Sequence, residues 1–263
     1  MRIWWQSMSS EAHATAYWPA LRQQLQSYAD PGTEIEVRGT RAGRLDQHRF
    51  FELLVTTSGL ANAVSAERQG FDAMAIGNIL DPGLRSVRAM IDIPVLGLGE
   101  TAMMTAGLMG GKFSLVFVSQ LFGPRILENA RLYGFESRLA ATDAIRSDPQ
   151  LINRAFTDEA VKDECLADFQ AAARRTIAAG AEVVIPAGGA LVSLLEWAGL
   201  RSVERVPVLN ALASLMKLTE ATVRLRAVTG VFISRQGLYA RPPADALDQA
   251  REAYRATYRI EDL

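Results

Sequence analysis

The sequence predicts an α/β fold of two pseudo-symmetric lobes, each with a mainly parallel sheet, and an active-site cleft between the lobes. Short apolar runs alternate with stretches of helical period, which is the pattern of parallel strands joined by helical crossovers. An internal repeat indicates two lobes, because residues 71–98 and 183–210 each contain a buried strand, a small-residue loop, a helix and a Pro-Val-Leu strand. Aligning the two repeats sets Asn78 opposite Gly188.

The first half of the chain alternates strand and helix as far as residue 100. Asp81 is expected to cap the helix that follows it, with Pro82 in the first turn of that helix. The arginine-rich residues 38–49 are expected to form an exposed loop. The strands are expected at residues 3–5, 33–37, 71–76 and 94–98, and the longer helices at 11–28 and 50–69.

The second half opens with an apolar helix that ends at the Gly110-Gly111 pair. Its strands are expected at residues 112–118, 139–141, 183–185 and 206–210, and its helices at 102–109, 124–133, 152–179, 191–198 and 211–228. Pro242-Pro243 precede a charged amphipathic helix that is expected to pack on the outside. We therefore expect a first lobe of residues 1–100 with about 211–228, a second lobe of 101–210, and a C-terminal extension of 229–263.

The composition and charge of the chain argue against several classes of function. The chain has 263 residues, a formal net charge of −1 and a pI near 6.2, which gives no electrostatic basis for binding nucleic acid or an anionic membrane. Cys165 is the one cysteine, so neither a disulfide nor a thiolate metal cluster can form within the chain. No apolar run approaches the ~20 residues that span a bilayer. A cytoplasmic protein is expected, acting on a small molecule and forming a homo-oligomer.

The candidate site is built from the residues that follow the predicted strands, because ligands of open α/β sheets bind beyond the carboxyl ends of strands. Small, amide and hydroxyl groups at these positions, with helix N-termini, suit a carboxylate or an enolate-like anion. The alternative is that the glycines and asparagines only make tight turns. The candidate catalytic residues are Glu100 and Asn78, and the candidate substrate-binding residues are Gln6, Ser7, Ser119, Gln120, Gly188, Gly189 and Asn210.

Several familiar chemistries lack support in the sequence. A Ser-His-Asp triad is not indicated, because His13 and His48 are the only histidines and no nucleophile-elbow motif is present. Dinucleotide and phosphate-loop motifs are absent as well. No cofactor and no metal site are predicted, although a carboxylate-rich metal site is not excluded. Cys165 lies within a predicted helix, away from every strand end, and is expected to serve packing.

The sequence resembles the aspartate/glutamate/hydantoin racemase superfamily, and its hydantoin-racemase-like branch in particular. The resemblance covers most of the chain and is carried by residues 1–3, Asp81–Leu84, Pro94–Glu100, Gly111–Ser114, Arg131–Gly134 and Gly180–Ile185. It implies two pseudo-symmetric, Rossmann-like α/β lobes and a cofactor-independent racemase that uses one cysteine from each lobe. The two cysteine positions of that family match Asn78 and Gly188 in this sequence.

Without these cysteines, two-thiol racemisation is ruled out, since neither an amide nor a glycine can be tuned as a thiol can to exchange a proton near neutral pH. We expect an isomerase or racemase-like enzyme that acts on a small carboxylate, amide or hydantoin-type compound, with Glu100 or a water as the proton carrier. If Glu100 is not the carrier, Asp46 and His48 are the next groups to test. The alternatives are a decarboxylase, lyase or hydrolase on the same fold, or a non-catalytic binding protein.

Overall fold

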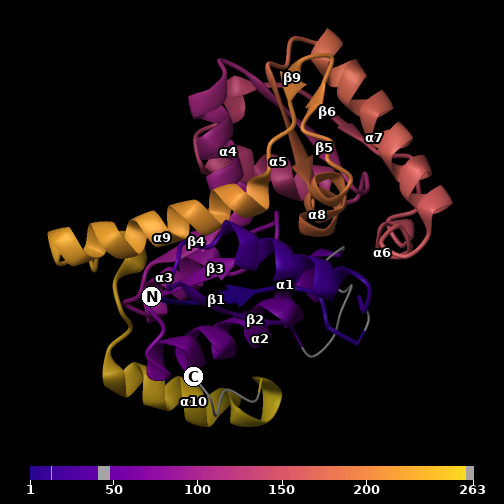
Figure 1. Cartoon of the computed structure of the whole chain (residues 1–263). Helices are drawn as coiled ribbons and strands as arrows, with labels where there is room; N and C mark the ends of the chain where they lie inside the picture. The colour runs from indigo at the N-terminus through magenta and orange to yellow at the C-terminus, as the bar shows by residue number, and fades with distance from the viewer. Residues whose placement is uncertain (13, 41–47, 259–263) are drawn as a thin grey trace.

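The computed structural model of the protein describes residues 1–12, 14–40 and 48–258, and these form two lobes, each built on a parallel sheet (Figure 1). The strand order is β2-β1-β3-β4 in the first sheet and β6-β5-β7 in the second. Every pair within these two sheets is parallel. The predicted fold class, with two lobes of parallel strands, is therefore confirmed.

The first lobe follows the predicted alternation closely. Its strands are β1 (Arg2–Gln6), β2 (Glu34–Arg38), β3 (Ala73–Ile76) and β4 (Val95–Gly97), and its helices are α1 (Tyr17–Tyr28), α2 (Arg49–Arg68) and α3 (Leu84–Met90). All four residues of β3 are buried, as expected of a strand covered on both faces. Helix α1 begins six residues later than its apolar period predicts, at Tyr17 rather than at residue 11.

The second lobe differs from the prediction in one long helix, which the structure divides into two. Its elements are α4 (Leu98–Met109), β5 (Phe113–Phe117), α5 (Gly123–Leu132), β6 (Leu139–Ala144), α6 (Leu151–Arg154), α7 (Glu159–Ala178), β7 (Val183–Ala187) and α8 (Gly189–Trp197). The expected helix over 152–179 is divided into α6 and α7, because the Asp158 carboxylate accepts the Val161 N–H at 3.2 Å and starts a new helix.

The predicted strand over 206–210 is also different in the structure. β8 (Ser202–Val203) and β9 (Val206–Pro207) pair in antiparallel fashion. Val208 forms an isolated parallel bridge to Val184 of the second sheet.

Helix α9 (Ala211–Thr229) returns the chain to the first sheet, where it packs on β3, β4 and α1, and it also contacts α4. Glu220 of α9 is fully buried and accepts hydrogen bonds from Asp30 N at 2.8 Å and from the Thr33 hydroxyl at 2.7 Å. These bonds tie α9 to the loop between α1 and β2. They agree with grouping residues 211–228 with the first lobe, although the exact lobe boundaries stay a prediction.

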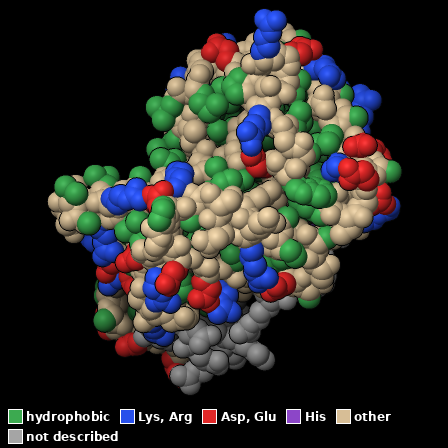
Figure 2. Space-filling model, viewed as in Figure 1, with side chains coloured by type: hydrophobic (Ala, Val, Ile, Leu, Met, Phe, Trp, Pro, Cys, Tyr) green, Lys and Arg blue, Asp and Glu red, His purple; other side chains and the backbone are tan. Residues whose placement is uncertain are grey.

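The last part of the described chain lies on the outside of the first lobe, with a short turn of helix at Gly237–Tyr239 and α10 (Ala244–Tyr258) (Figure 1). Arg241 holds this segment to the body through Asp92 at 2.7 Å. The end of α9 projects from the body and carries exposed apolar side chains, including Leu225 and Val228 (Figure 2). Homo-oligomer formation and cytoplasmic location stay predictions. Within the described residues, no helix combines the length and apolar character needed to cross a membrane.

The two lobes share one hydrophobic core. A single cluster of buried side chains includes Trp5 of the first sheet, Leu115 and Ile185 of the second, and Leu215 of α9. A core that is continuous across both lobes fixes their relative position. Any site between the lobes is therefore largely preformed.

Candidate active site

A cavity of about 170 Å³ lies between the lobes, at the carboxyl ends of β1, β3, β5 and β7. This volume is close to that of the apolar cavity of about 150 Å³ that holds a benzene molecule, so a five- or six-membered ring fits. It is lined by Ser7, Met8, Ser9, Ala14, Tyr17, Gly77, Asn78, Ile79, Val118, Phe122, Pro149, Gln150, Ile152, Asn153, Ala187, Gly188, Gly189 and Ala190.

Four of the sequence-predicted site residues lie together in this cavity: Ser7, Asn78, Gly188 and Gly189. The internal repeat had set Asn78 opposite Gly188, and the structure brings these two residues to the same cavity from different lobes. The chemical roles of these residues remain predictions.

Ser7 and Asn78 are held by local hydrogen bonds of the first lobe. The Ser7 and Ser9 hydroxyl oxygens lie 2.8 Å apart, and the Ser9 N–H donates to Ser7 Oγ at 3.3 Å. Asn78 Oδ1 accepts the Leu80 N–H at 2.9 Å, in the short side-chain turn that asparagine favours after a strand. This bond fixes the orientation of the Asn78 amide.

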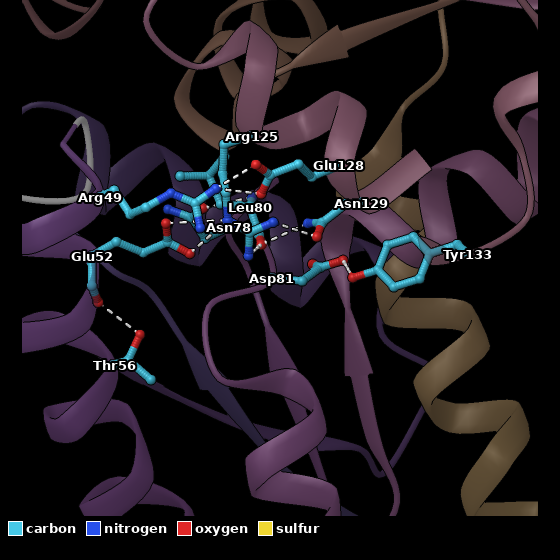
Figure 3. Close-up of polar contacts among 10 residues, drawn as sticks. All are labelled: Arg49, Glu52, Thr56, Asn78, Leu80, Asp81, Arg125, Glu128, Asn129 and Tyr133. Atoms are coloured by element: carbon cyan, nitrogen blue, oxygen red, sulfur yellow. Dashed lines mark hydrogen bonds and ion pairs between the residues drawn. The ribbon is translucent and has the colours of Figure 1, made fainter. Parts of the chain in front are cut away.

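The loop that carries Asn78 is also held by helix α5 of the second lobe, as Figure 3 shows. Asn129 Nδ2 donates to the Leu80 carbonyl at 2.8 Å. Arg125, one turn earlier on α5, forms an ion pair with Glu52 of α2 at 3.0 Å, and both side chains are largely buried. Buried, charge-assisted contacts of this kind are geometrically specific. The position of Asn78 therefore depends on contacts made by both lobes.

Asp81 does not cap the helix that follows it, which corrects the prediction from sequence. Helix α3 begins at Leu84, after Gly83 in a left-handed conformation with φ 73°. The buried Asp81 carboxylate instead accepts Gly99 N–H at 2.9 Å and Glu100 N–H at 2.7 Å, at the start of α4. A carboxylate at this place satisfies N–H groups that have no partner within the helix.

The hydroxyl of Tyr133 completes the surroundings of Asp81 by donating a hydrogen bond at 2.8 Å. Glycine is required opposite the carboxylate, because a Cβ on Gly97 would lie 2.4 Å from Asp81 Oδ1. Burial raises the pKa of Asp81 to about 7, against the opposing effect of its hydrogen bonds from Gly99, Tyr133 and Glu100. The group therefore titrates close to neutral pH.

The second lobe contributes the N-terminus of α8, where Gly188, Gly189 and Ala190 line the cavity. The first N–H groups of a helix have no partner within it and attract negative charge. Gly189 also permits the lobes to meet, since a Cβ there would lie 3.1 Å from the Gly77 carbonyl oxygen and 3.4 Å from the Tyr17 hydroxyl. The arrangement can hold an oxyanion.

The residues that close the cavity on the side of α1 and α6 were not recognised from sequence. The Tyr17 N–H donates to Asn153 Oδ1 at 3.2 Å, so the start of α1 in the first lobe is joined to α6 in the second. The Tyr17 ring lies 5.9 Å from the Phe156 ring, which stacks on Trp197 at 5.8 Å. Tyr17 was overlooked because the helix was expected to begin at residue 11, which placed this tyrosine in its interior. Asn153 lay within the expected long helix and gave no signal.

Glu100 does not line the cavity, which corrects its predicted place in the cleft. Its carboxylate forms an ion pair with Arg88, whose Nη1 lies 3.0 Å from Glu100 Oε1, and only 20% of the Glu100 side chain is exposed. Arg88 also donates to the Val95 carbonyl at 2.9 Å. Glu100 follows a strand as predicted, but its side chain leaves the helix toward α3.

Gln6 and Asn210 are likewise outside the cavity. The Gln6 side chain is buried beneath β1, where its Oε1 accepts from Trp4 Nε1 at 3.2 Å and from Asn62 Nδ2 at 2.8 Å. Asn210 caps α9 by accepting Ala213 N–H at 2.9 Å. The Gln6 amide serves the packing of the first lobe, whereas Asn210 caps a helix and also donates to the Tyr28 hydroxyl at 3.0 Å.

Ser119 and Gln120 are in the turn between β5 and α5 and do not line the cavity. Ser119 Oγ accepts Leu121 N–H at 3.3 Å, and Gln120 is exposed. Val118, the residue that follows β5, lines the cavity instead.

The other candidate reactive groups are not in the cavity either. Cys165 is fully buried in α7, away from the cavity lining, and burial raises the pKa of its thiol. His48 is exposed at the start of α2. Asp46 and His13 lie outside the described residues. Among the described residues, no three side chains of His, Cys, Asp or Glu gather as metal ligands.

Comparison with known proteins identifies the relatives of this fold and site. The family described as "Asp/Glu/Hydantoin racemase" matches residues 13–219. The hydantoin racemase of Paenarthrobacter aurescens is 26% identical over 233 residues, which cover 82% of this chain and 91% of that protein. Allantoin racemase from Klebsiella pneumoniae superposes with a TM-score of 0.71 at 26% identity, over 92% of this chain and 94% of that one.

A second solved structure, allantoin racemase from Pseudomonas fluorescens, superposes with a TM-score of 0.75 at 22% identity, over 92% of this chain and 97% of that one. The family match covers most of the chain and confirms both the resemblance and the prediction of a racemase-like enzyme. The chain belongs to the Asp/Glu/hydantoin racemase family.

Proposed function

We propose that the protein is a cofactor-independent racemase or isomerase that acts on a small cyclic amide of the hydantoin type without a pair of cysteines. The observation that carries this proposal is that Asn78 and Gly188 line one ring-sized cavity whose described lining is uncharged and mostly apolar, with a few hydroxyl and amide side chains. The site combines a binding cavity with a helix N-terminus that can hold an oxyanion, and its described lining contains no cysteine.

The lining favours a neutral cyclic amide over a dicarboxylate. Its described polar side chains are hydroxyls and amides, among them Ser7, Asn78 and Asn153. A second carboxylate entering this cavity would lose its hydration without gaining a cationic partner from these side chains, which is costly. The N–H and C=O groups of a hydantoin ring match hydroxyls and amides. Hydantoin and allantoin racemases among the relatives support the same class.

The proposed reaction removes the proton from the ring carbon next to a carbonyl and returns it from either face. The negative charge that develops on the carbonyl oxygen is held at the N-terminus of α8, beside Gly188 and Gly189. Glu100 is not proposed as the proton carrier, because it pairs with Arg88 outside the cavity. The described lining contains no thiol, carboxylate or imidazole, so we assign proton exchange to water in the cavity.

Deuterium exchange tests this proposal directly. Enantiopure 5-methylhydantoin and allantoin are incubated with the protein in deuterium oxide, and the ring C–H signal is followed by NMR while enantiomeric composition is followed by chiral chromatography. We expect the C–H signal and the enantiomeric excess to decay together. The Cys165→Ser variant serves as an active control and heat-unfolded protein as a blank. Binding without either change would identify a non-catalytic binding protein.

A decarboxylase is the second candidate, favoured by the absence of a base from the described lining. Loss of CO₂ from a carbon that bears a second carbonyl group leaves the same enolate without any proton being removed. Release of CO₂ from a ring compound that carries one carboxylate on the carbon next to a carbonyl, with no exchange of the hydantoin ring proton, would favour this candidate. The two reactions use the same oxyanion site and differ only in how the anion forms.

A further inference from the structure

We propose that the Tyr17 hydroxyl is a catalytic group of this cavity, where it donates a hydrogen bond to the oxyanion of the bound ring. This inference rests on the proposed function, because it assigns the side-chain donor for the enolate.

The position of Tyr17 places its hydroxyl at the anion-holding end of the cavity. Tyr17 lines the cavity, and only 5% of the residue is exposed. Its hydroxyl lies 3.4 Å from the point that a Cβ on Gly189 would occupy. Gly189 is the first residue of α8, so the phenol and the free N–H groups of that helix approach the same space.

The ring is fixed, and its hydroxyl makes no hydrogen bond to any residue in the described part of the chain. The Tyr17 N–H is held by Asn153, and the ring packs on Phe156. A tyrosine hydroxyl usually finds a hydrogen-bond partner when it is buried. A rigid donor that points into a ring-sized cavity, with no internal partner, is arranged to bond a ligand.

The chemistry of a buried phenol suits donation and not base catalysis. Desolvation raises the pKa of Tyr17, so the neutral phenol persists throughout the physiological pH range. A neutral phenol keeps its proton and can donate it in a hydrogen bond. One side-chain donor together with helix N–H groups forms an oxyanion hole, which lowers the energy of the charge that develops during the reaction.

Binding of two ring compounds separates this role from simple packing. Barbiturate is a planar cyclic ureide that carries a delocalised anion, like the proposed enolate, whereas 5,5-dimethylhydantoin is neutral and has no exchangeable ring C–H. Calorimetric affinities of both compounds are measured for the unchanged protein, for Tyr17→Phe and for Tyr28→Phe. Tyr28 is the matched control because it ends the same helix and does not line the cavity.

We expect Tyr17→Phe to weaken barbiturate binding about tenfold or more, the loss typical of a hydrogen bond to a charged partner, and to change dimethylhydantoin binding by less than about threefold. Tyr28→Phe should change neither affinity. Equal barbiturate affinity of Tyr17→Phe and unchanged protein, or an equal loss for both compounds, would overturn the assignment while leaving the proposed function intact. Failure of the unchanged protein to bind either compound would overturn the proposed function and this assignment together.

Discussion

Gly188 faces Val118 so closely that a side chain does not fit between them: a Cβ on Gly188 would lie 2.7 Å from Val118 Cγ1. Both residues line the cavity, at the ends of β7 and β5. The resemblance noted from sequence sets a family cysteine at the position of Gly188. A side chain at Gly188 would therefore require Val118 to move.

Gly188→Cys is expected to destabilise the protein unless Val118 is also made smaller. The added atoms overpack the contact, which typically costs about 1–3 kcal/mol. Thermal unfolding should show a lower Tm for Gly188→Cys, and the Gly188→Cys/Val118→Ala double variant should regain most of the loss. A Gly188→Cys protein as stable as the unchanged one would contradict the described contact.

The Arg88–Glu100 ion pair is predicted to be structural. Glu100→Gln leaves the largely buried Arg88 without its charged partner, and we expect a loss of about 2 kcal/mol or more in the free energy of unfolding. Catalysis per folded molecule should be unchanged, because Glu100 is outside the cavity. Glu136→Gln is the control, since the Arg131–Glu136 pair is exposed and should contribute less than about 1 kcal/mol. A selective loss of turnover in folded Glu100→Gln would return Glu100 to the site.

Asp81 should make stability fall as pH rises. Its pKa is about 7 in the folded protein, above the value of about 3.9 for an unfolded chain, so the native state binds the proton more tightly. The stabilisation is full below pH ~4 and is lost as pH approaches 7. Urea unfolding at pH 5 and pH 8 should therefore show a smaller free energy at pH 8.

Asp81→Asn is the matched test of this pH dependence, because asparagine tolerates the left-handed backbone at this position, where φ is 48°. The variant cannot ionise, so the difference in unfolding free energy between pH 5 and pH 8 should shrink. It should also be less stable at pH 5, since one amide replaces an oxygen that accepts the N–H groups of α4. An unchanged pH difference would assign the titration to another group.

The lone thiol is predicted to be dispensable for activity. Cys165 is fully buried among the side chains of α7 and does not line the cavity, so Cys165→Ser should retain turnover on whichever ring compound proves active. A stability loss of about 1–3 kcal/mol is expected, because the serine hydroxyl is buried in an apolar cluster. Iodoacetamide should leave the folded enzyme active. Complete loss of turnover in folded Cys165→Ser would contradict the placement of the active site.

The meeting of Asn78 and Gly188 could be predicted from sequence, because a repeated strand pattern places each residue at the carboxyl end of a parallel strand and ligands of α/β sheets bind beyond those ends. Hydrogen-bond partners that depend on tertiary packing could not be predicted from sequence. Local capping rules assigned Asp81 to the next helix, whereas its actual partner, Gly99, is 18 residues further along the chain. Glu100 was placed correctly after a strand, but the direction of its side chain depends on the rotation of α4 and on Arg88. Tyr17 enters the cavity through its contact with Asn153, 136 residues away.

Asn129 of helix α5 and Tyr133, the residue after that helix, reach across to the loop that carries Asn78. A polypeptide that contained only the first half would lack the two side chains of the second half that hold this loop. Duplication of one ancestral unit can explain the similar strands. The cavity itself belongs to the pair, because residues of both halves line it.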